Sequence, residues 1–212
     1  IRKVADELGM EVVPCFASLG YGGPFLSNDP NLAEGIAVKD APFIVENGTA
    51  RAVLEPDTRL RGGDFEEHNG NVFPLLHNQD APGKATFCDT EVKASGRASC
   101  RLEARPPYWN EAEFPMARVN FDFKVRPWHA YRLFFKVKTR NLKGTLRVEV
   151  NSTSTSPTTP EILSRQLPAP SIMATQEWKE VCVLFNSWDN TELDVDIGLW
   201  KFAVEGGVAW LD

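Results

Sequence analysis

Several features that mark particular protein classes are missing from this chain of 212 residues. It has no run rich in lysine and arginine, and its formal net charge is −6, so we expect no nucleic-acid partner. No apolar run approaches the roughly 20 residues that a membrane-spanning helix needs, so we expect no membrane partner. The four cysteines lack CxxC spacing, which argues against a thiolate zinc site. The three histidines form no spaced cluster, which argues against histidine-based catalysis or metal binding.

The cysteines leave two interpretations open. Cys88 and Cys100 flank a turn and could face each other across paired strands as a disulfide. They could equally be buried thiols that behave as small apolar side chains.

What is present indicates an ordinary folded protein. Apolar residues make up 42% of the chain and charged residues 25%, a balance typical of globular domains. The length suffices for one sizeable core with an appendage, or for two small domains. The chain begins at Ile1 rather than Met and ends at Asp212, so we expect a piece of a longer protein.

The first part of the chain, residues 1–54, has the pattern of an α/β fragment followed by a linker. "IRKVADELG" predicts a helix that ends at Gly9, and "MEVVPCFA" predicts a short buried strand. A long loop rich in Gly, Pro, Asn and Asp follows. One such unit cannot bury its own strand, so we expect these residues to form the edge of a larger α/β domain.

The rest of the chain, residues 55–212, has the period of β-strands. "RVNFDFKV" alternates apolar and polar residues, and "YRLFFKVKT", "TLRVEV", "WKEVCVLF" and "ELDVDIGLW" follow with similar spacing. We therefore predict an all-β domain, an antiparallel β-sandwich of the jelly-roll kind with about eight to ten strands. Residues 151–170 are polar and proline-rich, and we predict a long surface loop there.

Six tryptophans, all after residue 100, suggest a binding surface, because aromatic rings stack on the apolar faces of sugars. For each ring the alternative is packing in the core or at the rim of the sandwich. The candidate carbohydrate-binding residues are Tyr108, Trp109, Asn110 and Glu111 in one loop, Asn186 and Trp188 in another, and Trp200.

Five segments, "LRGGDFEE", "DTEVKASGRASCRLE", "YRLFFKVKT", "EWKEVCVLFNS" and "VDIGLWKFAVEGGVAWLD", occur in this order. Together they resemble carbohydrate-binding modules of the family 4/9/22 type, which are jelly rolls attached to glycoside hydrolases. The match spans residues 60–212, with Gly62 in place of the usual Asn. The segment "VADELGMEVVP" resembles a helix and strand of (β/α)8-barrel glycoside hydrolases.

The resemblance implies a structural calcium ion. Its ligands would be Glu66, the turn from Ser95 to Arg97, and Asp212. Calcium combines carboxylate and carbonyl oxygens, which suits this set. The alternative is that the acidic side chains near Glu66 are simply solvated. Phe65 is expected to lie in the first strand of the sandwich and to anchor that strand to the core.

Three functions remain open on the sequence. The first is a noncatalytic domain that binds a polysaccharide or oligosaccharide beside the catalytic domain of its parent chain. The second is a structural or interaction sandwich without sugar binding. The third is a catalytic glycosidase or polysaccharide lyase, for which Glu111 and Glu113 are the available carboxylate pair. The resemblance implies a secreted protein, extracellular or periplasmic.

Overall fold

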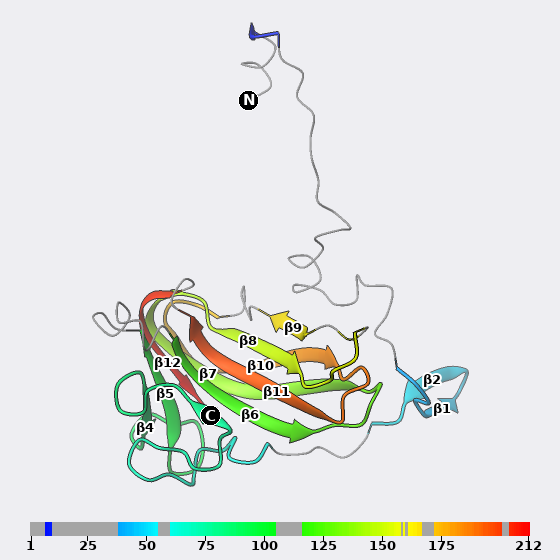
Figure 1. Cartoon of the computed structure of the whole chain (residues 1–212), viewed down its shortest axis with the longest axis horizontal. Helices are drawn as coiled ribbons and strands as arrows, with labels where there is room; N and C mark the ends of the chain where they lie inside the picture. The colour runs from blue at the N-terminus through cyan, green and yellow to red at the C-terminus, as the bar shows by residue number, and fades with distance from the viewer. Residues whose placement is uncertain are drawn as a thin grey trace.

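The computed structural model of the chain describes residues 7–9, 38–54, 60–104, 116–157, 159, 161–166, 172–200 and 204–212. Two five-stranded antiparallel sheets pack into a sandwich (Figure 1). This confirms the predicted all-β sandwich.

The first sheet has the strand order β10-β7-β12-β5-β4, and the second has the order β3-β6-β11-β8-β9. The strands of the first sheet are β4 (Thr86–Asp89), β5 (Ser99–Ala104), β7 (Ala130–Gly144), β10 (Gln176–Asn186) and β12 (Val204–Leu211). Those of the second are β3 (Asn78–Gln79), β6 (Met116–Lys124), β8 (Arg147–Ser152), β9 (Ile162–Gln166) and β11 (Glu192–Trp200). In both sheets, strands distant in sequence are neighbours.

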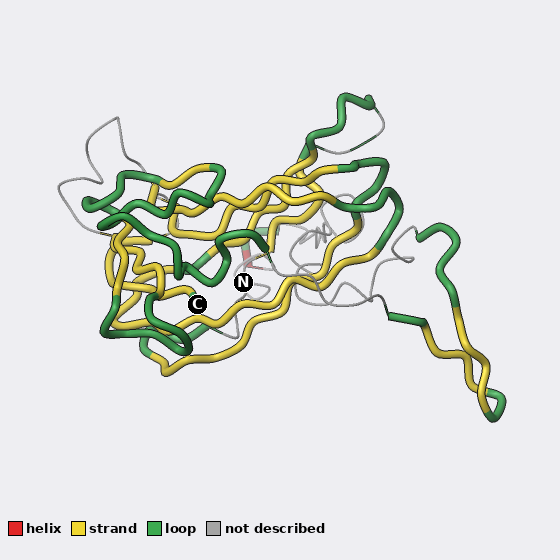
Figure 2. The backbone as a smooth tube through the Cα atoms, turned by 90° about the horizontal axis from the view of Figure 1, so that it is seen from below, coloured by secondary structure: helices red, strands yellow, loops and turns green. Residues whose placement is uncertain are grey.

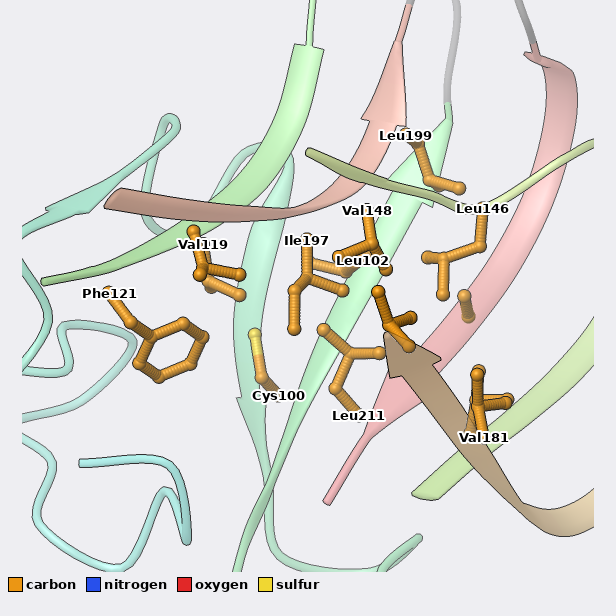
Figure 3. Packing of buried hydrophobic residues seen from close by; sticks show 14 of the residues in the cluster. Cys100, Leu102, Val119, Phe121, Leu146, Val148, Val181, Ile197, Leu199 and Leu211 are labelled. Atoms are coloured by element: carbon orange, nitrogen blue, oxygen red, sulfur yellow. The ribbon is translucent and has the colours of Figure 1, made fainter. Parts of the chain in front are cut away.

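The core lies between the inner faces of the two sheets. Alternate residues of β11 from Leu193 to Leu199 are buried, as the period of two in the sequence requires. They share one cluster with Leu102 of β5 and Leu211 of β12 (Figure 3). The residues between them on β11 point outward and form part of the candidate site.

Phe65 anchors the segment that leads into the sandwich, as the sequence predicts. Its side chain is buried, and its ring lies 5.2 Å from the ring of Phe73 and 6.1 Å from that of Phe121. The backbone around it is a turn and loop rather than a strand, and Phe65 itself has a φ of 55°. The ring contacts hold this segment in place without a strand pairing.

The prediction of an unbroken loop over residues 151–170 is wrong in two parts, the first being Asn151 and Ser152, which end β8 and pair with β11. Residues Ile162–Gln166 form β9, which pairs with β8 at the edge of the second sheet. An edge strand needs only one neighbour and tolerates nearby prolines, so a polar composition did not prevent it. Leu163 supplies the contact with the core.

A β-hairpin, which the sequence reading did not foresee, precedes the sandwich. Strands β1 (Phe43–Glu46) and β2 (Thr49–Ala52) pair with each other and project away from the two sheets (Figures 1 and 2). The turn is Asn47-Gly48, and both residues have positive φ, at 50° and 76°. An Asn-Gly pair between apolar runs is a strong hairpin signal, so the sequence did contain this information.

The predicted helix and strand of the N-terminal segment lie almost entirely outside the described residues. Gly9, the predicted end of the helix, has a φ of 65°, which suits a C-cap glycine. Among the described residues, no helix has the length and apolar character needed to span a bilayer.

Candidate functional site

The outer face of the second sheet carries polar side chains in rows that cross three strands. In one row the register aligns Arg118 of β6, Gly198 of β11 and Arg147 of β8. The next row aligns Asn120, Asp196 and Glu149, and a third aligns Asp122, Asp194 and Asn151. Because residues paired across strands point to the same face, these side chains form one continuous polar surface.

Trp200 lies at the arginine end of this surface. The guanidinium carbons of Arg118 and Arg147 lie 5.6 and 5.0 Å from the centre of its ring, within the range of cation–π contacts. Gly198 leaves the space between the two arginines without a side chain. A Cβ there would come closer than 3.0 Å to backbone atoms of Ala117 and Arg118, so the position requires glycine. The half-buried Trp200 ring therefore lies beside a surface formed by the Gly198 backbone and the two guanidinium groups.

Ion pairs fix the arginines in these positions. Arg118 Nε lies 2.8 Å from Asp80 Oδ2, and Arg147 NH1 lies 3.2 Å from Glu149 Oε1. Both arginine side chains are about three-quarters buried, so solvent weakens these pairs less than it weakens exposed ones. They therefore hold the groups around Trp200 in fixed directions.

Asp196 lies at the centre of the face and is held from two sides. Its Oδ1 accepts a hydrogen bond from Asn120 Nδ2 at 3.2 Å, and its Oδ2 accepts one from Asn151 Nδ2 at 3.1 Å. Burial raises the pKa of this carboxyl above its ordinary value, although the Asn120 amide and the Arg118 guanidinium favour the charged form.

Three buried polar atoms of this face have no hydrogen-bond partner among the described residues. They are Asn120 Oδ1, Asp194 Oδ1 and Arg147 Nε. Buried polar atoms are nearly always paired, and an unmade hydrogen bond is costly, so these atoms are available to a partner beyond the described residues, such as a ligand. Two acceptors and one donor along a face that ends at a tryptophan match an extended ligand rich in hydroxyl groups.

The structure separates the aromatic candidates that the sequence put forward. Trp200 lies on the polar face. Tyr108, Trp109, Asn110 and Glu111, together with Glu113, lie outside the described residues. Trp188 precedes β11, whereas Trp200 is its last residue. Because a strand rises about 3.3 Å per residue, the length of β11 alone separates the two tryptophans by roughly 25 Å. Trp188 and Trp200 thus cannot contribute to one compact site.

Trp188 belongs to a separate cluster at the rim of the sandwich. Its ring lies 5.8 Å from that of Trp128, and the Lys39 ammonium lies 4.2 Å from the centre of the Trp128 ring. Both tryptophans have positive φ, at 51° and 61°, which is unusual for large side chains. Asn186 is buried, and its Oδ1 accepts a hydrogen bond from the Trp188 N–H at 2.6 Å. The Asn186 side chain therefore stabilises the backbone of the loop that carries Trp188.

The turn at residues 94–98 holds Glu66, the first carboxylate that the resemblance assigns to calcium. Glu66 Oε1 accepts hydrogen bonds from the N–H groups of Arg97 and Ala98, at 2.6 and 3.3 Å. Its Oε2 accepts one from Arg97 Nε at 2.9 Å. Gly96 lies against this carboxylate with a φ of 58°, and a Cβ there would overlap with it.

The same turn holds the last residue of the chain. Asp212 Oδ2 accepts hydrogen bonds from the N–H groups of Ala94 and Ser95, at 2.9 and 3.2 Å. Its Oδ1 accepts one from the Ser95 hydroxyl at 2.8 Å. The turn thus joins the beginning of the sandwich to its end, as the sequence predicts for Glu66 and Asp212. We name these contacts the terminal clasp.

The donors in the clasp differ from the set that the resemblance implies for calcium. N–H groups, a hydroxyl and a guanidinium face the carboxylates, rather than the carbonyl oxygens that calcium prefers. Among the described residues, no three His, Cys, Asp or Glu side chains are grouped to hold a metal. A calcium ion at Glu66 would compete with Arg97 for Oε2. Calcium at Glu66, Ser95, Arg97 and Asp212 therefore stays a prediction.

Replacing Glu66 by glutamine is expected to destabilise the protein at neutral pH but not in acid. Hydrogen bonds from Arg97 lower the pKa of Glu66 from 4.5 to about 2. The charged carboxylate therefore contributes stability above about pH 4.5, and this contribution disappears as the pH falls towards 2. We expect a loss of about 1 kcal/mol at pH 7, modest because Arg97 is exposed.

Thermal unfolding of the wild type and of Glu66→Gln between about pH 2.5 and pH 7 measures the difference in stability between the two proteins at each pH. Glu67→Gln is the matched control, because Glu67 is adjacent and exposed. A difference that is equally large at pH 2.5 and pH 7 would contradict the assignment. Added calcium tests the ion in the same experiment, since an ion bound at Glu66 should stabilise the wild type and not the variant.

The sequence reading missed most of the polar face, although one signal was available. The outward positions of "ELDVDIGLW" after Glu192 are Asp194, Asp196, Gly198 and Trp200, an unusual combination of carboxylates, glycine and tryptophan on one side of a strand. The partners on β6 and β8 carried no such signal, because their roles depend on which strands are neighbours.

Comparisons with known proteins find similar folds among solved structures alone. No family model matches the chain, and no curated protein matches it. Similar solved structures include "CBM4 structure and function", at 14% identity and a TM-score of 0.46, covering 73% of this chain and 96% of the other. "Family 16 Carbohydrate Binding Module-2" is 13% identical, with a TM-score of 0.43 and coverage of 61% and 83%. The CBM22-1 xylan-binding domain from Paenibacillus barcinonensis Xyn10C is 15% identical, with a TM-score of 0.40 and coverage of 70% and 86%. With identities and TM-scores this low, function has to be inferred from the chain's own residues.

Proposed function

We propose that this chain is a noncatalytic carbohydrate-binding domain whose site is the outer face of the β3-β6-β11-β8-β9 sheet. The observation that carries the proposal is the set of unpaired buried atoms on Asn120, Asp194 and Arg147, which follow one another along the face that Trp200 ends. A sugar ring stacks on an indole, and its hydroxyls both donate and accept hydrogen bonds, so one glycan meets both requirements.

The wider setting follows from the resemblance described for the sequence. The domain would be the accessory part of a secreted glycoside hydrolase, outside the cell or in the periplasm. Its binding would keep the catalytic domain close to the glycan and raise the effective concentration of substrate, without lowering a reaction barrier.

A second candidate is a structural sandwich that binds no sugar. It is favoured by the two arginines over Trp200, because guanidinium groups on a ring compete with a stacking sugar. In that case the polar face would serve only to hold β6, β8 and β11 in register.

Binding to soluble polysaccharides separates the two candidates. In affinity electrophoresis or calorimetry against a panel of glucans, xylans, mannans and galactans, the wild type should bind at least one. Trp200→Ala should weaken that binding by about tenfold or more, since loss of a central aromatic contact typically costs over 1 kcal/mol.

Trp188→Ala is the matched control, because it removes the same side chain at the other end of β11. We expect its affinity to stay close to that of the wild type. Absence of binding to every glycan would leave the structural sandwich as the function. Loss of binding in Trp188→Ala alone would move the site to the rim. Circular dichroism of each variant checks that the fold is retained.

A further inference from the structure

We infer that Asp194, together with Asp122, excludes acidic glycans from the polar face. This inference rests on the carbohydrate-binding function proposed above and specifies which ligands the same site accepts. It arises from the uneven distribution of charge along the three rows of the face.

The two carboxylates lie directly opposite each other on neighbouring strands. The register pairs Asp122 of β6 with Asp194 of β11, and Asn151 follows on β8. Like charges at directly opposed positions repel each other. The Asp122 carboxylate lies near one ring nitrogen, since its Oδ2 is 3.9 Å from His77 Nδ1. Asp194 Oδ1 is buried and has no hydrogen-bond partner among the described residues.

The described cations of the polar face lie in other rows than Asp194, and two of them are already in ion pairs with carboxylates. Arg118 and Arg147 lie in the row nearest Trp200, each in an ion pair with a carboxylate. Lys124 lies opposite Glu192 in the row beyond Asp194. Among the described side chains, the carboxylates at these positions are Asp80, Asp122, Glu149, Glu192, Asp194 and Asp196, and the cations are Arg118, Lys124 and Arg147. Acidic groups are therefore in excess, and the excess is concentrated in the row of Asp194.

An anionic sugar would fail at this row for two physical reasons. First, a uronate or sulfate group would face like charges on a partly desolvated surface, where repulsion is stronger than in bulk water. Second, Asp194 Oδ1 and Asn120 Oδ1 are acceptors that need a donated proton. Ionised carboxylate and sulfate groups have none to donate. An unpaired charge that penalises the wrong ligand is a known means of specificity.

A neutral glycan meets neither obstacle. A hydroxyl can donate to Asp194 Oδ1, another can donate to Asn120 Oδ1, and a third can accept from Arg147 Nε. Asp194 is then a ligand-contacting residue for neutral sugars and the main barrier to acidic ones.

Matched neutral and acidic polysaccharides test this directly. The pairs are hydroxyethylcellulose with carboxymethylcellulose, dextran with dextran sulfate, and arabinoxylan with glucuronoxylan. At low ionic strength the wild type should bind the neutral member of a pair about tenfold or more tightly than the acidic member. Added salt should narrow this ratio, because it screens the repulsion.

Two variants locate the effect at Asp194. Asp194→Asn removes the charge and keeps the Oδ1 acceptor, so it should narrow the neutral-to-acidic ratio by about threefold or more. Asp194→Ala should weaken binding of the neutral glycan by about tenfold, because the acceptor is lost as well. Glu180→Gln makes the same change of charge on β10 of the other sheet and should leave the ratio unchanged.

The outcomes distinguish this inference from the proposed function. Binding of an acidic polysaccharide as tightly as its neutral counterpart would overturn the inference and leave carbohydrate binding intact. An unchanged ratio in Asp194→Asn would also overturn it. If no polysaccharide of either kind binds, the proposed function itself is wrong.

Discussion

Replacing Gly207 by alanine is expected to destabilise the sandwich by about 3 kcal/mol or more, through strain and overlap together. Gly207 lies in β12 with a φ of 100°, where side chains are rarely accommodated. A Cβ there would come closer than 3.0 Å to the carbonyl oxygen of Asn141 and to Leu142 Cα on β7. Both are backbone atoms, so relief requires the two strands to separate.

Gly70→Ala is the control for the backbone contribution. Gly70 also has a positive φ, 59°, but nothing lies within 4 Å of its added Cβ. We expect it to cost about 1 kcal/mol, the strain alone. Urea unfolding of both variants gives the comparison. Equal losses in the two variants would show that the close approach of β12 and β7 is not the cause.

Replacing Leu102 by alanine is expected to cost about 2–5 kcal/mol, the range for a fully buried leucine. Leu102 of β5 has no exposed surface and belongs to the cluster between the sheets (Figure 3). The loss combines the transfer free energy of the removed atoms with the cavity left behind. The spread of the range reflects how far the neighbours relax into that cavity.

Leu54→Ala provides the matched comparison, since the side chain of Leu54 is 76% exposed. Its effect on the free energy of unfolding should lie within about 0.5 kcal/mol. The same denaturant titration serves both leucines. A loss under about 1 kcal/mol for Leu102→Ala would mean that the packing between the sheets is looser than the structure indicates.

Much of the fold could be read from local sequence. The alternation in "RVNFDFKV" and "ELDVDIGLW" predicted strands that are now β6 and β11, and the predicted burial of Phe65 is confirmed. The errors have local causes as well. The polar composition around β9 hid an edge strand, and the Asn47-Gly48 signal of the hairpin was overlooked.

The candidate site was far less accessible, because its contacts join distant parts of the chain. Asn120 and Asp196 are 76 positions apart, and Asp80 and Arg118 are 38 apart. No spacing rule connects such residues. Trp200 was named from its chemistry alone, whereas the arginines around it depended on β11 lying between β6 and β8.

The sequence by itself determined which residues of each strand face the core and which face outward, because side chains alternate with a period of two. The resemblance to carbohydrate-binding modules, and not the residues alone, placed Glu66 and Asp212 at one turn, where both carboxylates are found. Only the tertiary structure decided which outward residues share a row, because strand order and register are set by packing between sheets. That register places Asp122 beside Asp194 and both arginines beside Trp200, and it gives the polar face its two unlike ends.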